Sequence, residues 1–175
     1  MNHVHSDVAL VVFAVAVTAA TPTSLRAQRL TERDLRVGGL PVNADTTAVR
    51  RVFGAPTGIR PYRDDDGHVL IAWRYPDLTV SVDLTGHGYS WQLSSPRLAT
   101  TRGVRPGDLT SRVRSAYGRP SVEYPHNILY SLRPEDGANT LGIDFYVVQG
   151  VVRTVSIGNV ISIEPHTGPV NLQPN

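Results

Sequence analysis

The stretch VRRVFGAP at residues 49–56 returns as VRSAYGRP at residues 113–120, with valine, arginine, glycine and proline in the same order. A shift of 64 residues aligns 39–56 with 103–120 without a gap, and six of the 18 positions are identical. Similarity at a fixed spacing is typical of a duplicated structural unit. The repeat therefore predicts that the chain contains one unit twice.

The first copy predicts a short capped helix. Asp45 or Thr46 can accept backbone N–H bonds at the helix start, and Val49, Val52 and Phe53 fall on one face. An apolar face of this kind must be buried against another element.

The second copy predicts the same element. Asp108 or Thr110 can cap this helix, and Leu109, Val113 and Tyr117 repeat at a spacing of four. Because two helical turns are not stable alone in water, each helix needs a surface to pack on.

Both predicted helices end at a glycine, Gly54 or Gly118. Glycine accepts the left-handed conformation that ends a helix, and the prolines two residues later prevent the helix from restarting.

Short segments rich in β-branched and aromatic residues supply the surface that the helices need. Three such segments follow each helix, at 69–75, 78–84 and 89–93 and again at 127–132, 140–148 and 151–157. The predicted fold class is α+β, with two tandem units of one helix and a three-stranded antiparallel meander that share a sheet or a core.

The predicted organisation has four parts. Residues 1–27 are interpreted as a secretory signal peptide cleaved after Ala27, because the apolar run at 8–20 is too short to cross a bilayer of ~30 Å as a helix. The first unit covers 37–95, the second covers 102–163, and the proline-containing tail at 164–175 is expected to be disordered.

Composition restricts the compartment and the chemistry. The chain has no cysteine, which excludes disulfides and the cysteine of a bacterial lipid anchor, so we expect a periplasmic or secreted protein without stable membrane insertion after signal cleavage. It also has no lysine, which excludes a lysine Schiff base and a Walker lysine. The formal charge of +2 does not favour nucleic acid as a partner.

Six arginines against one acid lie between residues 97 and 119. Such a run is either a solvated face or a surface for an acidic partner.

The first unit resembles a known family. VNADTTAVRRVFGAP at 42–56, followed by WRYPDLTVSVDL at 73–84, is similar to the SmpA/OmlA family of small bacterial outer-membrane proteins, which includes the E subunit of the β-barrel assembly machine. The positions that match the family pattern are Val49, Gly54, Pro56, Trp73 and Tyr75. The tandem arrangement also resembles the β-lactamase inhibitory protein family, whose members bind enzyme partners over a concave sheet. The second resemblance implies a protein-binding role, and the first implies the fold of each unit.

Two carboxylates are the strongest catalytic candidates. Asp83 and Asp144 have equivalent places in the two predicted middle strands, and a glycoside hydrolase uses two carboxylates. Alternation places both on the sheet face opposite the helices, where Arg74 has the parity to form an ion pair with Asp83.

Other site signatures favour structural interpretations. The run at 64–68 (DDDGH) indicates a hairpin turn, since residue 75 is tyrosine where a calcium loop needs glutamate. The histidines lack the spacing of a zinc helix, and no Gly-x-Ser-x-Gly occurs. Trp73, Tyr75, Tyr89 and Trp91 share parity with core positions and are interpreted as packing residues.

The sequence thus predicts a non-catalytic extracytoplasmic interaction module of the bacterial cell envelope, with no cofactor and no metal. The expected partner is an envelope protein or another extracytoplasmic protein, bound through Arg74, Asp83, Asp144 and Tyr146. Two alternatives stay open: an inhibitor of an extracytoplasmic enzyme, and a weak hydrolase using Asp83 and Asp144.

Overall fold

The computed structural model describes residues 29–64, 67–133 and 139–161, so the predicted signal peptide and tail lie outside the described residues. In this part of the chain, ten strands form one antiparallel sheet of two strands and one of eight. The helices are a 3-10 turn η1 (Glu32–Asp34), α1 (Thr46–Phe53) and α2 (Thr110–Tyr117).

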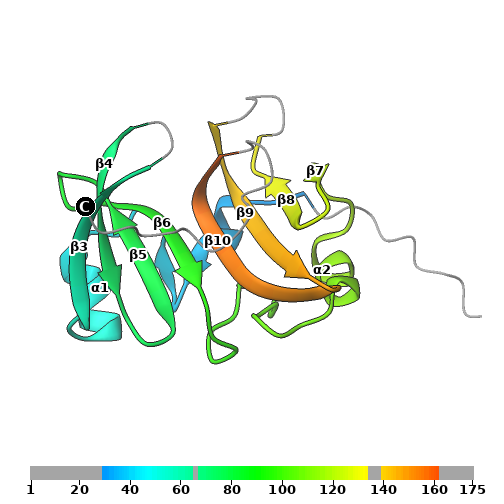
Figure 1. The fold of residues 1–175 in the computed structure, drawn as a ribbon, viewed down its shortest axis with the longest axis horizontal. Helices are drawn as coiled ribbons and strands as arrows, with labels where there is room; N and C mark the ends of the chain where they lie inside the picture. Colours follow the sequence, from blue (N-terminus) through cyan, green and yellow to red (C-terminus); the bar gives the residue numbers. More distant parts are fainter. Residues whose placement is uncertain (1–28, 65–66, 134–138, 162–175) are drawn as a thin grey trace, which may run out of the picture.

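The large sheet has the strand order β3-β4-β5-β6-β10-β9-β8-β7 (Figure 1). Its strands are β3 (Gly58–Arg63), β4 (Val69–Arg74), β5 (Leu78–Val82), β6 (Gly88–Leu93), β7 (Val122–Glu123), β8 (Asn127–Ser131), β9 (Asn139–Val148) and β10 (Val151–Ile161). The small sheet is a hairpin of β1 (Arg36–Val37) and β2 (Leu40–Pro41).

The predicted α+β fold of two helix-plus-three-strand units is wrong. The described structure is mostly β, its two α-helices have only eight residues each, and the eight strands that follow them form one continuous sheet. The sequence prediction missed β3, which reads GIRPYR, and the two-residue β7. Glycine, proline and arginine argue against an interior strand, but both missed strands lie at the edges of the sheet, where such residues are tolerated.

The two halves of the sheet are joined by β6 and β10. These strands pair antiparallel, with Trp91 opposite Ile157 and Leu93 opposite Val155. All four side chains are almost completely buried. The protein therefore has one core that runs through the joint.

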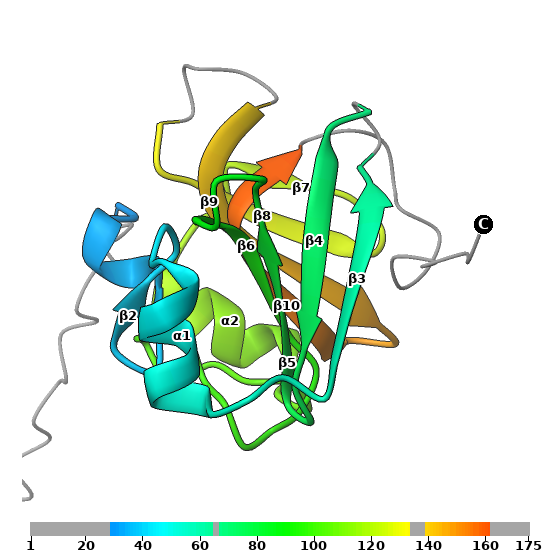
Figure 2. The ribbon, with the colours of Figure 1, turned by 90° about the vertical axis from the view of Figure 1, so that its left-hand side faces the viewer.

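Both helices pack on the same face of the sheet. The Phe53 ring of α1 lies 5.8 Å from that of Trp91, and the Tyr117 ring of α2 lies 5.4 Å from that of Phe145. The strand register places Trp91 and Phe145 on one face, and Figure 2 shows both helices on one side of the strands. We call the opposite side the outer face.

One of the two predicted helix caps is confirmed and the other is wrong. The Asp45 carboxylate accepts a hydrogen bond from the Ala48 N–H at 2.8 Å, which confirms the first cap. The second is wrong, because Leu109 is the N-cap residue of α2 and makes no side-chain cap. Asp108 instead accepts an N–H bond from the turn before it.

The first residue of each helix forms a hydrogen bond with the tip of a hairpin. The Thr46 N–H donates to the Gly86 carbonyl at 3.1 Å, and the Thr110 N–H donates to the Gly150 carbonyl at 3.0 Å. Donor and acceptor are both shifted by 64 residues, as in the sequence repeat. The repeat therefore marks a helix start that is bound to the tip of a hairpin.

The glycines that end the helices are expected to resist substitution. Gly54 has φ 80° and ψ −160°, and Gly118 has φ 76° and ψ −138°. This differs from the predicted left-handed helical conformation and is close to a region that is essentially restricted to glycine. We expect Gly54→Val and Gly118→Val each to lower the free energy of unfolding by more than ~1 kcal/mol. Urea unfolding that matches the wild type in both variants would refute this explanation of the helix ends.

Pro61 is expected to keep the open edge of β3 from pairing with other chains. The Asp64 N–H donates to the His68 carbonyl, so the backbone of Asp64 faces β4. Because every second residue of a strand faces the same neighbour, the backbone groups of Tyr62 and Arg60 also form hydrogen bonds with β4. Pro61 lies between them, and its missing N–H is on the open edge. Pro61→Val restores that donor, so we expect concentration-dependent self-association by light scattering. A variant that stays monomeric at every concentration would count against this role.

Candidate functional site

The outer face is the surface on which the sequence prediction placed all four site residues, Arg74, Asp83, Asp144 and Tyr146. The register puts alternate residues of each strand on it. Its members are Arg60, Tyr62, Leu70, Ala72, Arg74, Thr79, Ser81, Ser90, Gln92, Thr154, Ser156, Asp144, Tyr146, Asn127, Leu129 and Ser131.

Small polar residues form the centre of the outer face. They come from the three middle strands and comprise Thr79, Ser81, Ser90, Gln92, Thr154 and Ser156. Ser81 is buried, and its Oγ lies 2.7 Å from the Tyr62 hydroxyl, which reaches across β4 from β3. Burial raises the pKa of Tyr62, so this hydroxyl stays protonated.

Arg74 and Asp83 do not form the predicted ion pair. Arg74 lies opposite Thr79 on β5, whereas Asp83 lies beyond the end of that strand in the turn to β6. Val82 pairs with Ile71, three residues before Arg74 on β4, and Asp83 lies one residue further on. Asp83 is therefore displaced from Arg74 by four residues, or about 13 Å, along the strand direction.

The Asp83 carboxylate has a structural role in that turn. Its Oδ1 accepts hydrogen bonds from the Thr85 hydroxyl at 2.6 Å, the Thr85 N–H at 2.9 Å and the His87 N–H at 3.0 Å. The Thr85 hydroxyl and the His87 N–H hold the pKa of Asp83 below its usual value. Asp83 therefore shapes the hairpin tip that binds the start of α1.

Asp144 and Tyr146 lie on the outer face of β9 as predicted by alternation. The Asp144 Oδ2 accepts a hydrogen bond of 2.7 Å from the Asn127 Nδ2 of β8. The Tyr146 ring packs at 6.3 Å from the His126 ring. The sequence interpretation missed Asn127, which is 9% exposed.

The positions of the two carboxylates do not support the hydrolase alternative. Asp83 follows β5 and Asp144 lies in β9, and β6 and β10 separate these strands. Three strand intervals amount to about 14 Å along the sheet. Paired glycosidase carboxylates lie within roughly 9.5 Å of each other.

The shifted pKa values of the described residues move away from neutrality. Burial raises the pKa of Tyr117 and of Tyr130 to about 12, and hydrogen bonds from Arg102 and Thr31 outweigh burial to lower that of Asp34. An acid–base catalyst needs a pKa near its working pH. These groups are therefore suited to packing and ion pairing rather than to proton transfer.

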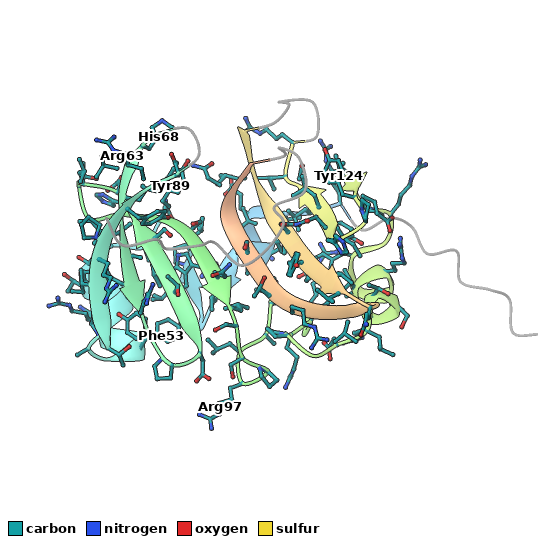
Figure 3. The ribbon with its side chains drawn as sticks, viewed as in Figure 1. Phe53, Arg63, His68, Tyr89, Arg97 and Tyr124 are labelled. Atoms are coloured by element: carbon teal, nitrogen blue, oxygen red, sulfur yellow. The ribbon has the colours of Figure 1, made fainter. Side chains whose placement is uncertain are left out.

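The DDDGH run contributes to a hairpin, as predicted, although residues 65 and 66 lie outside the described residues. The Asp64 carboxylate accepts the His68 N–H at 2.7 Å and lies 3.1 Å from the His68 Nδ1. Figure 3 shows His68 with Arg63 at the β3–β4 end of the sheet. Within 29–64, 67–133 and 139–161, no three His, Asp or Glu side chains gather as metal ligands.

Three of the four predicted packing aromatics are confirmed. Trp73, Tyr75 and Trp91 are buried in the core. Tyr89 is only half-buried, so its assignment to the core is wrong. A register shift between Ser81 and Val82 of β5 changes the alternation of β6 at this point.

The arginine run does not form one solvated face. Arg102 forms a mostly buried ion pair with Asp34, Arg114 forms an ion pair with Glu123, and Arg97 extends from the lower margin of the fold near Asp77 (Figure 3). Half of the run is therefore neutralised by acids of the same chain.

Comparison with known proteins found no matching family model, no matching curated protein and no matching solved structure. The resemblance to the SmpA/OmlA and β-lactamase inhibitory protein families therefore stays a prediction from motif positions. None of the described helices has the length and apolar character needed to span a membrane.

Proposed function

We propose that this protein is a non-catalytic, extracytoplasmic protein-interaction module of the bacterial cell envelope, and that its outer face is the recognition surface. The observation that carries the proposal is the asymmetry of the eight-stranded sheet. One face is packed against α1, α2 and the segment before α1, whereas the other presents small polar side chains from the three middle strands.

The size and chemistry of the outer face fit this role. Eight strands spaced by about 4.8 Å and about 17 Å long give roughly 600 Å² in projection, close to the ~800 Å² that each partner contributes to a standard interface. Short side chains such as those of Thr79, Ser90 and Ser156 lose little rotamer freedom when a partner covers them.

The extracytoplasmic location rests on the apolar run at 8–20, which has the length of the hydrophobic part of a secretory signal. The envelope partner rests on the resemblance of the first helix and strand to the SmpA/OmlA family.

A pair of single-cysteine variants tests the recognition surface, since the natural chain has no cysteine. Gln92→Cys places a benzophenone label at the centre of the outer face, and Arg51→Cys places the same label at an exposed position of α1. Illumination in envelope extract should give a protein adduct from position 92 and none from position 51. No adduct at 92, or equal adducts at both positions, would reject the outer face.

The inhibitor alternative uses the same face and differs in its consequence for the partner. Titration of the protein into assays of β-lactamase and envelope peptidase turnover separates the two roles. A stoichiometric loss of turnover by one of these enzymes would favour an inhibitor over a non-inhibitory interaction module.

A further inference from the structure

Two arginines lie next to each other on the outer face near the edge of the sheet. Arg60 of β3 is paired with Ala72, and Arg74 of β4 is paired with Gly58. The two arginines are therefore diagonal cross-strand neighbours on one face, with Cβ atoms roughly 7 Å apart. The sequence interpretation included Arg74 but missed Arg60, because β3 was not recognised as a strand.

No acid of the described chain neutralises this pair. Ion pairs in the described segments join Asp64 with His68, Asp77 with Arg97, Asp34 with Arg102 and Glu123 with Arg114, and none includes Arg60 or Arg74. On the outer face, Asp64 is bonded to His68 and lies four residues from Arg60, or about 13 Å along the strand, and Asp144 is four strand intervals from β4, or about 19 Å. Adjacent like charges repel, so the fold retains a repulsion that an external anion would relieve.

Small residues leave room for such an anion. A Cβ atom built on Gly58, the neighbour of Arg74, would meet no atom within 4 Å. Thr79 lies opposite Arg74 with a hydroxyl that can donate a further hydrogen bond, whereas Ala72, opposite Arg60, is already buried. Tyr62, two residues after Arg60, is fixed by its bond to Ser81 and borders this space.

The donor set favours carboxylates. A guanidinium group offers a planar fork of N–H donors that matches the two oxygens of a carboxylate. Two guanidinium groups on adjacent strands can bind two acidic side chains of one extended segment. A nucleic acid requires a longer basic surface than two arginines on a chain of formal charge +2.

We propose that Arg60 and Arg74 form an anion-binding subsite of the outer face that binds the carboxylates of an acidic segment in the protein partner. This subsite rests on the proposed function of the outer face and specifies the chemistry of the partner at its β3–β4 end.

Fluorescence polarisation with a labelled peptide of eight glutamates tests the subsite, with a peptide of eight glutamines as the uncharged probe. Arg60→Gln/Arg74→Gln removes both forks. Arg51→Gln/Arg112→Gln removes the same charge from exposed positions on the two helices. We expect wild-type binding that weakens with salt, is at least roughly tenfold weaker in the outer-face variant, and is nearly unchanged in the helix variant.

Equal binding by the two double variants, or no binding of the glutamate peptide by the wild type, would overturn the subsite. Binding of inorganic phosphate or of an oligothymidine in place of the glutamate peptide would also overturn it. Equal melting temperatures of the variants confirm that the comparison is made on folded protein. The adduct of the labelled Gln92→Cys variant separates the two proposals. If that adduct forms but the peptide test is negative, only the subsite fails. If the adduct does not form, the proposed function fails.

Discussion

Gly88→Ala is expected to lower the free energy of unfolding by about 3 kcal/mol or more. A Cβ atom at Gly88 would lie 2.0 Å from the Val42 carbonyl oxygen and 3.2 Å from that of Ala44. The Val42 carbonyl also accepts the buried Trp91 Nε1–H bond at 2.8 Å, and the Gly88 N–H donates to Ala44. The new methyl group cannot avoid backbone atoms, so the segment before α1 must leave β6 and the indole loses its acceptor.

The melting temperature measures this effect, with an expected decrease of roughly 10 °C. Gly58→Ala is the matched control, because it is also a strand glycine and a Cβ atom there meets nothing within 4 Å. We expect the control to change stability by less than ~0.5 kcal/mol. Two equally mild variants would show that residues 42–44 do not lie against β6.

Asp34→Ala is expected to lower the free energy of unfolding by about 3 kcal/mol, because it removes the carboxylate that neutralises the mostly buried charge of Arg102. The Arg102 Nε and Nη2 donate to the two carboxylate oxygens of Asp34 at 2.8 and 2.7 Å. The guanidinium lies 4.7 Å from the Tyr117 ring centre and also donates to the Ala116 carbonyl. This pair therefore joins η1 to α2.

The exposed pair of Arg114 with Glu123 provides the comparison. Arg114→Ala should cost less than ~1 kcal/mol, since exposed ion pairs contribute little. A double-mutant cycle over Asp34 and Arg102 measures their coupling by urea unfolding. Coupling no larger than that of the exposed pair would contradict the buried connection.

The same pair predicts the acid dependence of stability. Burial raises the pKa of Asp34, but the hydrogen bonds from Arg102 and Thr31 outweigh it, so the folded pKa is below the usual value. Protons then bind the unfolded state more readily, and stability rises with pH through this range. The contribution is complete above about pH 4 and decreases as pH falls through the folded pKa. In urea titrations at pH 7 and pH 3, Asp34→Asn should lose less stability than the wild type.

The parts of the fold that sequence could predict are those with local signals. Alternation located β5 and β9, and the Gly-x-Pro motif located the ends of both helices. The fold class failed because β3 combines glycine, proline and arginine and is identified as a strand only by its pairing with β4. The joint between β6 and β10 likewise depends on contacts between residues more than 60 positions apart.

The candidate site was predicted only in part for the same reason. Period-two alternation was sufficient to place Asp144 and Tyr146 on the outer face. It misplaced Asp83, because β5 ends at Val82, two residues before the predicted end, and the Asp83 carboxylate accepts hydrogen bonds from Thr85 and His87 in the turn. Arg60 could have been found by the same alternation if β3 had been recognised.

Both proposals require one continuous sheet with a single outer face across the β6–β10 joint. In a chain without cysteine, Gln92→Cys/Ser156→Cys tests this directly, because the two residues are register partners on that face. Mild oxidation should close one intramolecular disulfide at a cross-strand Cα separation of about 5 Å, detected by mass spectrometry. Thr79→Cys/Ser156→Cys, two strand intervals apart at about 10 Å, should stay reduced. Free thiols or only intermolecular disulfides in the first variant would contradict the account.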